Sequence, residues 1–302
     1  MNQAHQPSYP FSVPILVMLG AFLFSSKGIF VKMMYEEGLP PSAALALRMA
    51  SAFPFYLLPV LLSLRTLRSI PSRDWLMMAG LAFVGYFLSS LVNFTGLQYI
   101  SVGLERVILF SYPTLVLLGA SIFQKRKASY RLYLAATVSW TGLYLVIQEE
   151  MVLSQKLDAV LLGSGLILLS AMIYAGYILL AKPVIERIGV RSYTSISMSF
   201  SCLFVLLNHS LNSPVVLHEV MTPKLIGLGL TIGILGTVFP TYLLSYGLSK
   251  ISSSSYAVIS SVGPVATIAL SLLMLGQTPG AWQLAGIGMS VCGSLMAARS
   301  KA

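Results

Sequence analysis

The sequence predicts an all-α integral membrane protein, with ten transmembrane helices arranged as two inverted-topology repeats of five helices and both termini in the cytoplasm. Three observations predict this fold class. The chain of 302 residues is 56% hydrophobic and only 9% charged, whereas soluble domains carry about 25% charged residues. Basic residues gather in alternate connections between apolar runs, and a shift of 151 residues aligns the second half of the chain with the first.

Ten apolar runs are long enough to cross a bilayer, because a spanning helix needs about 20 residues. Charges and clusters of Pro, Gly, Asn and Ser bound these runs. The expected spans are 13–35, 41–62, 75–93, 99–122, 131–148, 159–181, 192–212, 223–247, 251–274 and 280–298. The first five form a repeat at 13–148 and the last five a repeat at 159–298. No segment is long and polar enough to form a soluble domain, so any function is expected within the membrane.

The basic residues predict the orientation of the chain. Alternate loops and the C-terminal tail hold thirteen of them, namely Arg65, Arg68, Arg73, Lys125, Arg126, Lys127, Arg131, Lys182, Arg187, Arg191, Lys250, Arg299 and Lys301. The opposite side has only Lys32, Lys156 and Lys224. Because basic loops stay cytoplasmic, both termini are expected inside, in a bacterial cytoplasmic (inner) membrane. Topology therefore explains the net charge of +10, and no basic stripe predicts binding to nucleic acid.

The internal repeat extends across all five spans without a gap. The matched pairs are Gly38 with Gly189, Gly85 with Gly236, Gly96 with Gly247, Ser101 with Ser252, Pro113 with Pro264, and Gly142 with Gly293. Because five spans are an odd number, the second half must enter the membrane from the opposite side. Many secondary transporters are built in this way, with a substrate site near the midplane at the repeat interface. A structural or receptor-like bundle that arose by duplication is the alternative.

Two prolines occupy matching places in spans four and nine. Pro113 and Pro264 each remove a backbone donor and free a carbonyl, and such interruptions point to the binding site of a transporter. Tyr112 and Gly263, which precede them, are therefore expected to border the cavity. An ordinary kink of a membrane helix is the alternative for each proline.

Several segments resemble a known family. Phe24-Ser-Ser-Lys-Gly-Ile-Phe-Val-Lys32, Gly103-Leu-Glu-Arg-Val-Ile-Leu-Phe-Ser-Tyr-Pro113 and Leu275-Gly-Gln-Thr-Pro279 resemble EamA-type members of the drug/metabolite transporter superfamily. The resemblance implies a ten-span, two-repeat carrier that moves metabolites or amino acids, generally outward and without ATP. The chain departs from the family at Gln277, where a Glu is common, and at Phe24, where a Trp is common.

Four charged residues lie well inside the expected spans, away from the span ends: Lys27, Arg48, Glu105 and Arg106. At a rise of 1.5 Å per residue, they lie about 8–12 Å below the outer boundary. Charges at such depth are costly and mark functional sites. None of their repeat partners is charged, so we expect a polar cluster at the outer end of a central cavity. The alternative is that both arginines snorkel to the interface.

This cluster supports two hypotheses about the substrate and its coupling. Three cations with one carboxylate keep a net positive field, which favours a small-molecule substrate carrying a carboxylate or a phosphate. In the second hypothesis Glu105 couples transport to protons. The two conflict in part, because cations that clamp a carboxylate hold it in its ionised form.

Polar and aromatic residues within the spans are further candidates. Tyr86, Tyr112, Tyr177 and Tyr242 are expected to contact substrate together with Asn93, and Tyr174 lies at a similar position. Packing is the alternative for each tyrosine. Small residues recur every four positions in spans eight and ten, which favours close helix packing within the chain or, alternatively, a dimer seam.

The sequence favours a transporter over an enzyme. His5, His209 and His218 lie at the terminus or at loop ends, and no metal site, cofactor motif, nucleophile motif or P-loop is present in the sequence. We therefore expect a secondary exporter of a small metabolite or amino acid that works by alternating access between the repeats. A non-transporting membrane scaffold and an enzyme acting on lipid headgroups are the alternatives.

Overall fold

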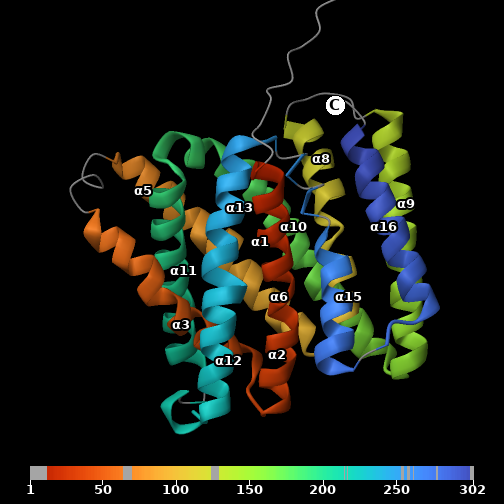
Figure 1. Ribbon diagram of the computed structural model, residues 1–302, viewed down its shortest axis with the longest axis horizontal. Helices are drawn as coiled ribbons and strands as arrows, with labels where there is room; N and C mark the ends of the chain where they lie inside the picture. Colours follow the sequence, from red (N-terminus) through yellow and green to blue (C-terminus); the bar gives the residue numbers. More distant parts are fainter. Residues whose placement is uncertain are drawn as a thin grey trace, which may run out of the picture.

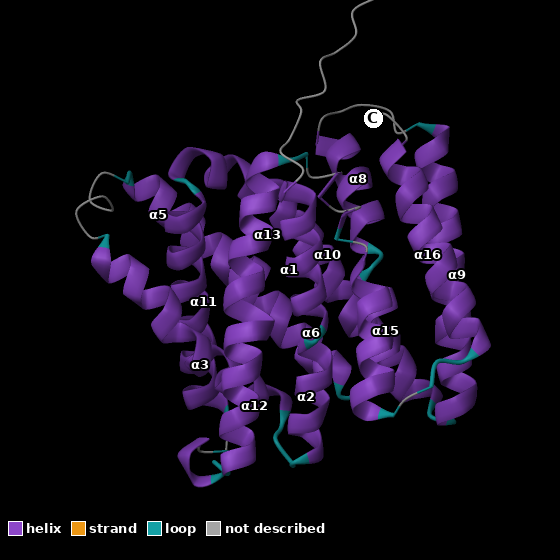
Figure 2. Ribbon diagram, in the orientation of Figure 1, coloured by secondary structure: helices purple, strands orange, loops and turns teal. Residues whose placement is uncertain are grey.

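A computed structural model describes residues 12–299 except 64–69, 124–128, 214, 216, 253–254, 257–258, 261 and 277. These described residues form helices, turns and loops, with no strand among them. The helices stand side by side in one bundle (Figures 1 and 2). Five of the predicted cytoplasmic basic residues fall in 64–69 and 124–128, outside the described part of the chain.

The helices of the first half follow the expected apolar runs. They are α1 (Ser12–Ser25), α2 (Lys27–Glu36), α3 (Pro41–Leu62), α5 (Ser72–Leu81), η1 (Ala82–Leu88), α6 (Ser89–Leu97), α7 (Val102–Leu109), α8 (Tyr112–Phe123) and α9 (Tyr130–Ser154). The predicted first span is divided at Ser26 into α1 and α2, and the predicted fourth span is divided at Phe110 and Ser111 into α7 and α8. The third expected span continues through η1, a π-helical stretch, without ending.

The second half repeats this order. Its helices are α10 (Leu157–Ile188), α11 (Val190–Asn212), η2 (Leu217–Glu219), α12 (Pro223–Gly233), η3 (Ile234–Val238), α13 (Phe239–Lys250), α15 (Val262–Leu275) and α16 (Ala281–Arg299). Seven described helical segments are long and apolar enough to cross a membrane. They correspond to the first four expected spans and to spans six, seven and eight.

Backbone features of the two halves coincide under the shift of 151 residues. Gly38 and Gly189 both have positive φ, 85° and 89°; Gly38 lies in the turn that leads to α3, and Gly189 directly precedes α11. A positive φ favours glycine, because other residues carry a Cβ that clashes there. The π-helical stretch η3, shifted back by 151 residues, falls at 83–87 within η1. Sequence similarity at these positions therefore accompanies similar local geometry.

Four helix pairs make the most extensive contacts in the bundle. α3 packs on α11, α9 on α16, α1 on α13, and α6 on α10. Figure 1 shows α9 and α16 side by side at one edge of the bundle. Their close approach uses Gly142 and Gly286, because a Cβ on either one would collide with the backbone oxygen of the other. In span eight, a Cβ added at Gly229 or Gly233 would meet α3, so these small residues serve packing within the chain.

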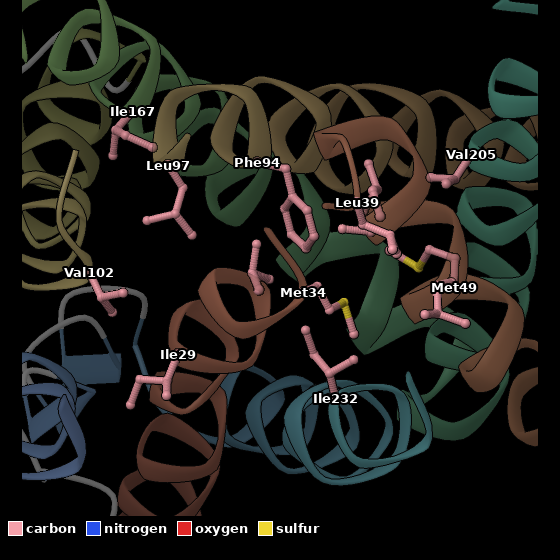
Figure 3. Packing of buried hydrophobic residues seen from close by; sticks show 14 of the residues in the cluster. Ile29, Met34, Leu39, Met49, Phe94, Leu97, Val102, Ile167, Val205 and Ile232 are labelled. Carbon is pink, nitrogen blue, oxygen red and sulfur yellow. The ribbon is translucent and has the colours of Figure 1, made fainter. Parts of the chain in front are cut away.

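Among the described residues, buried apolar side chains form two large clusters besides a third, small one. One packs near the turn between α2 and α3, where Met34, Phe94 and Ile232 come from three different helices (Figure 3). The other includes Ile185, Tyr193 and other residues near the junction of α10 and α11.

Candidate functional site

A cavity of about 110 Å³ lies inside the bundle, which is several times the space that one buried water requires. Its walls come from both halves of the chain: α1, α2, α3, η1, α6, α7 and α8 from the first, and α10, α13 and α15 from the second. Three cations contribute to the wall, Lys27, Arg48 and Arg106. The described residues of the wall include no acidic side chain.

Glu105 lies directly behind this wall and joins two of the cations. Its carboxylate lies 3.8 Å from Lys27 Nζ and 3.4 Å from Arg106 Nε. Asn93 bridges the same groups, because its Oδ1 accepts from Lys27 Nζ at 2.7 Å and its Nδ2 donates to Glu105 Oε1 at 3.0 Å. All four side chains belong to residues that are at most 7% exposed. This charge cluster is therefore an interior feature of the protein.

Arg106 and Lys27 also contact residues next to the break between α1 and α2. Arg106 Nη2 donates to the backbone oxygens of Phe24 and Ser25, at 2.6 and 3.1 Å. Lys27 Nζ lies 5.2 Å from the centre of the Phe24 ring. Carbonyls near a helix break lack their usual intrahelical donors, and here a cation satisfies two of them.

Arg48 is bound differently. Its Nε donates to Thr237 Oγ1 at 2.7 Å, and its guanidinium lies 5.6 Å from the centre of the Phe94 ring. Arg48 is 2% exposed, and within the described residues its Nη1 has no hydrogen-bond partner and its side chain makes no salt bridge. The alternative that Arg48 and Arg106 snorkel to the interface is wrong for this structure, because both are buried against other helices.

Local sequence explains why these side chains meet. Ser101 caps α7 by accepting from the Leu104 amide, and Glu150 at the end of α9 accepts from the amide and hydroxyl of Ser101 at 2.7 Å each. Side-chain oxygens satisfy the free amides at a helix start. This anchoring holds the start of α7 in place, so that Glu105 reaches Lys27 of α2 and Arg106 reaches the end of α1. The π-helical stretches act similarly: η1 carries Tyr86 to the cavity, and η3 carries Thr237 to Arg48.

Tyrosines form the wall away from the cations. Tyr174 stacks on Tyr177 with ring centres 5.7 Å apart, and Tyr177 packs against Tyr86 at 4.8 Å. The hydroxyl of Tyr177 donates to that of Tyr86 and accepts from that of Tyr193. Tyr112 bonds Ser260 across the two halves. This end of the cavity therefore presents aromatic rings, with several hydroxyls engaged by one another.

Most of the residues predicted for the site lie around this cavity. Its wall includes Lys27, Tyr86, Asn93, Tyr112 and Tyr177, together with Arg48 and Arg106. Tyr242 does not line it, since its hydroxyl bonds Ser195 and its ring lies 5.8 Å from that of Tyr56. Tyr112 and Gly263 are among the residues that border the cavity. The side chains of the adjoining Pro113 and Pro264 are outside the described part of the structure.

Sequence reasoning missed several contributors. Phe94 and Thr237 contact the cations but carry no charge that would have marked them. Ser89 and Ser170 hydrogen-bond one another across the halves in the cavity wall, and Tyr256 contributes another ring. A serine in a membrane span is a weak signal, because serine also serves helix packing. Among the described residues, no cluster of three His, Cys, Asp or Glu side chains is arranged to hold a metal ion.

Comparison with known proteins decides the family. The sequence profile of the EamA-like transporter family matches residues 12–148 and 161–299. The chain belongs to this family. Its membership, together with the seven apolar helices, identifies an integral membrane protein with a transporter role. The superfamily resemblance inferred from the sequence is confirmed.

Two similar proteins from Bacillus subtilis carry the name of uncharacterized transporters. Uncharacterized transporter YcbK of Bacillus subtilis is 29% identical over 278 residues, which cover 91% of this chain and 88% of that protein. Uncharacterized transporter YwfM of the same organism is 21% identical over 291 residues, which cover 93% of this chain and 92% of that protein. A crystal structure with 15% identity matches with a TM-score of 0.67 over 96% of this chain and 97% of the other, which shows a shared fold.

Proposed function

We propose that this protein is a secondary transporter that moves a small organic anion through the central cavity by alternating access. The observation that carries the proposal is the cavity itself, whose wall comes from both halves and contains three buried cations with no described acid. Buried charge inside a membrane protein is costly and marks pathways for substrates or ions. A carboxylate or phosphate on the substrate would offset this positive charge.

The proposed architecture is ten spans in two halves, 13–148 and 159–298, with inverted topology. The two separate family matches, the paired glycines with positive φ and the paired π-helical stretches support this division. α9, α15 and α16 supply the three spans beyond the seven that length and composition identify. The alternating basic loops support cytoplasmic termini in a bacterial inner membrane, and the family resemblance supports export.

Two ion pairs between the halves support alternating access. Glu37 pairs with Lys224 at 2.5 Å near the turn between α2 and α3. Asp74, in the first turn of α5, pairs with Arg187, in the last turn of α10. Figure 1 shows α5 at the end of the bundle opposite to that turn. Shifted back by 151 residues, Lys224 and Arg187 fall at 73 and 36, beside Asp74 and Glu37. The two pairs are thus counterparts under the repeat. We propose that each closes one end of the cavity, and that transport breaks them in turn.

The contacts of Glu105 favour a structural role over proton carriage. Its carboxylate is the counter-charge of Lys27 and Arg106, and Asn93 donates to it. Protonation of the Glu105 carboxylate would leave Lys27, Arg48 and Arg106 without any negatively charged partner among the described residues. Proton-coupled transport through Glu105 remains the competing hypothesis, and the variant Glu105→Gln separates the two through the pH dependence of transport.

Counterflow in proteoliposomes tests the proposed function. Vesicles with the reconstituted protein are loaded with pools of organic anions, amino acids, sugars or phosphorylated metabolites, and the exchange of labelled compounds is measured. We expect exchange for an anionic pool and none in vesicles without protein. Folded protein that exchanges no pool would refute transport and favour a membrane scaffold.

A further inference from the structure

The three cations of the cavity differ in how the chain neutralises them. Lys27 and Arg106 share one carboxylate, that of Glu105, and Arg106 also binds two backbone oxygens. Within the described part of the chain, the guanidinium of Arg48 contacts the Thr237 hydroxyl and the face of the Phe94 ring. It is 2% exposed, lines the cavity and leaves Nη1 without a partner among the described residues. Among the three cations, Arg48 is therefore the one for which the described structure supplies no counter-charge.

An uncompensated buried guanidinium is costly, because a charge taken from water needs an ion partner or several hydrogen bonds. Its planar array of donors matches a carboxylate, which accepts two parallel hydrogen bonds. A carboxylate that enters the cavity would give Arg48 this partner. It would also reduce the net positive charge of Lys27 and Arg106, which share the single carboxylate of Glu105 among the described residues.

The rest of the wall favours an apolar or aromatic body. Tyr174, Tyr177 and Tyr86 present stacked and tilted rings, and hydroxyls of this group bond one another. Leu244 and Leu248 of α13 add aliphatic surface. Rings arranged in this way accept a flat apolar group, since aromatic pairs favour offset and edge-to-face packing. This wall provides little to hold a strongly hydrated second charge.

An amine on the substrate would find no counter-charge. The described wall has no carboxylate, and Glu105 behind it already contacts Lys27 and Arg106. An ammonium group in this cavity would therefore face three cations at short range, in surroundings where repulsion is poorly screened. Zwitterionic amino acids carry such a group on the carbon next to the carboxylate.

We propose that the substrate is an organic monocarboxylate with an apolar or aromatic body and without an amine, and that Arg48 is the residue that binds its carboxylate. This inference rests on the proposed function and names the substrate class for the same cavity. It selects among the anions that the cluster admits, and it places amino acids and inorganic phosphate outside the preferred class.

Comparing how tightly four small probes bind tests the substrate class directly. The probes are 3-phenylpropanoate, L-phenylalanine, which adds an ammonium to the same skeleton, 2-phenylethylamine, which lacks the carboxylate, and inorganic phosphate. Binding to the purified full-length protein is measured by the rise in its unfolding temperature, because a ligand stabilises the state that it binds. We expect 3-phenylpropanoate to bind at least tenfold more tightly than each of the others. Equal or tighter binding of phenylalanine or phosphate would overturn the proposal.

Variants test the role of Arg48. Arg48→Met is expected to lose binding of 3-phenylpropanoate, and Arg48→Lys, which keeps the charge but not the planar array, to weaken it at least tenfold. Arg131→Met, at an exposed position of α9, serves as the matched control and should bind as the wild type does. Unchanged affinity in Arg48→Lys would overturn the assignment even where Arg48→Met does not fold.

A second variant tests the aromatic wall. Tyr174→Leu should reduce the preference for 3-phenylpropanoate over butanoate while both still require Arg48. If the reconstituted protein transports amino acids in preference to monocarboxylates without an amine, this inference is refuted while the proposed transporter function stands. Absence of exchange with every pool would refute the proposed function itself.

Discussion

Replacing Glu105 by glutamine removes the only negative charge that the described structure places beside Lys27 and Arg106. At the observed separations of 3.8 and 3.4 Å, each attraction is worth about 4–5 kcal/mol at an effective dielectric constant of about 20. Desolvation offsets much of this gain in the intact protein. Removing one partner of a buried pair nevertheless costs about 3–5 kcal/mol, because the remaining charge is left uncompensated.

The expected loss is measurable as a lower unfolding temperature in detergent, followed by the fluorescence of the three tryptophans. At about 2 °C per kcal/mol for a large domain, we expect a fall of roughly 6 °C or more. Glu186→Gln is the matched control. Glu186 pairs with Lys182 at 3.0 Å, but its side chain is 51% exposed, so this change should cost at most about 1 kcal/mol.

A second substitution distinguishes charge balance from a general packing defect. Adding Lys27→Met to Glu105→Gln removes one of the orphaned cations, so the double variant should unfold at a higher temperature than Glu105→Gln alone. Unfolding of Glu105→Gln at the wild-type temperature would refute the reasoning. Equal losses in Glu105→Gln and Glu186→Gln would do so as well.

Two further predictions concern the ends of the cavity and the helix seam. A cysteine introduced at Ser90, in the cavity wall, can be labelled with a membrane-impermeant maleimide. Glu37→Gln should increase this labelling when the maleimide is added on the outer side, and Asp74→Asn when it is added on the cytoplasmic side. Identical labelling in both variants would contradict the role of these ion pairs. Gly142→Ala should lower the unfolding temperature, because the added Cβ collides with the backbone of α16. Gly165→Ala should be neutral or stabilising, because the space around its Cβ is open. Similar effects of the two substitutions would contradict the packing of α9 on α16.

The sequence allowed the elements and the charge cluster to be predicted for physical reasons. Hydrophobic length identifies a spanning helix, and the cost of burying charge makes Lys27 and Glu105 conspicuous. Because Lys27 and Glu105 lie at similar distances from the ends of their helices, they are expected at a similar depth in the membrane. The matched glycines were informative because Gly38 and Gly189 meet a backbone requirement that few other residues satisfy.

The rotation of each helix about its axis could not be predicted. Lipid and protein interior are both apolar, so hydropathy does not separate the face toward the cavity from the face toward lipid. Tyr174 lines the cavity and Tyr242 does not, although both lie deep in apolar spans. The break at Ser26 has no proline or glycine at that position to signal it, and the π-helical stretches have no sequence pattern of comparable strength.

Accessibility of a cysteine at Ser90 provides the most direct test of the central claim, that both sides of the membrane reach this cavity in turn. The cysteine is introduced with Cys202 and Cys292 replaced by serine, and membrane-impermeant maleimide is applied to one side of sealed vesicles of known orientation. We predict labelling from each side, with 3-phenylpropanoate protecting the cysteine from both. Labelling from one side only, with and without the anion, would contradict alternating access through this cavity.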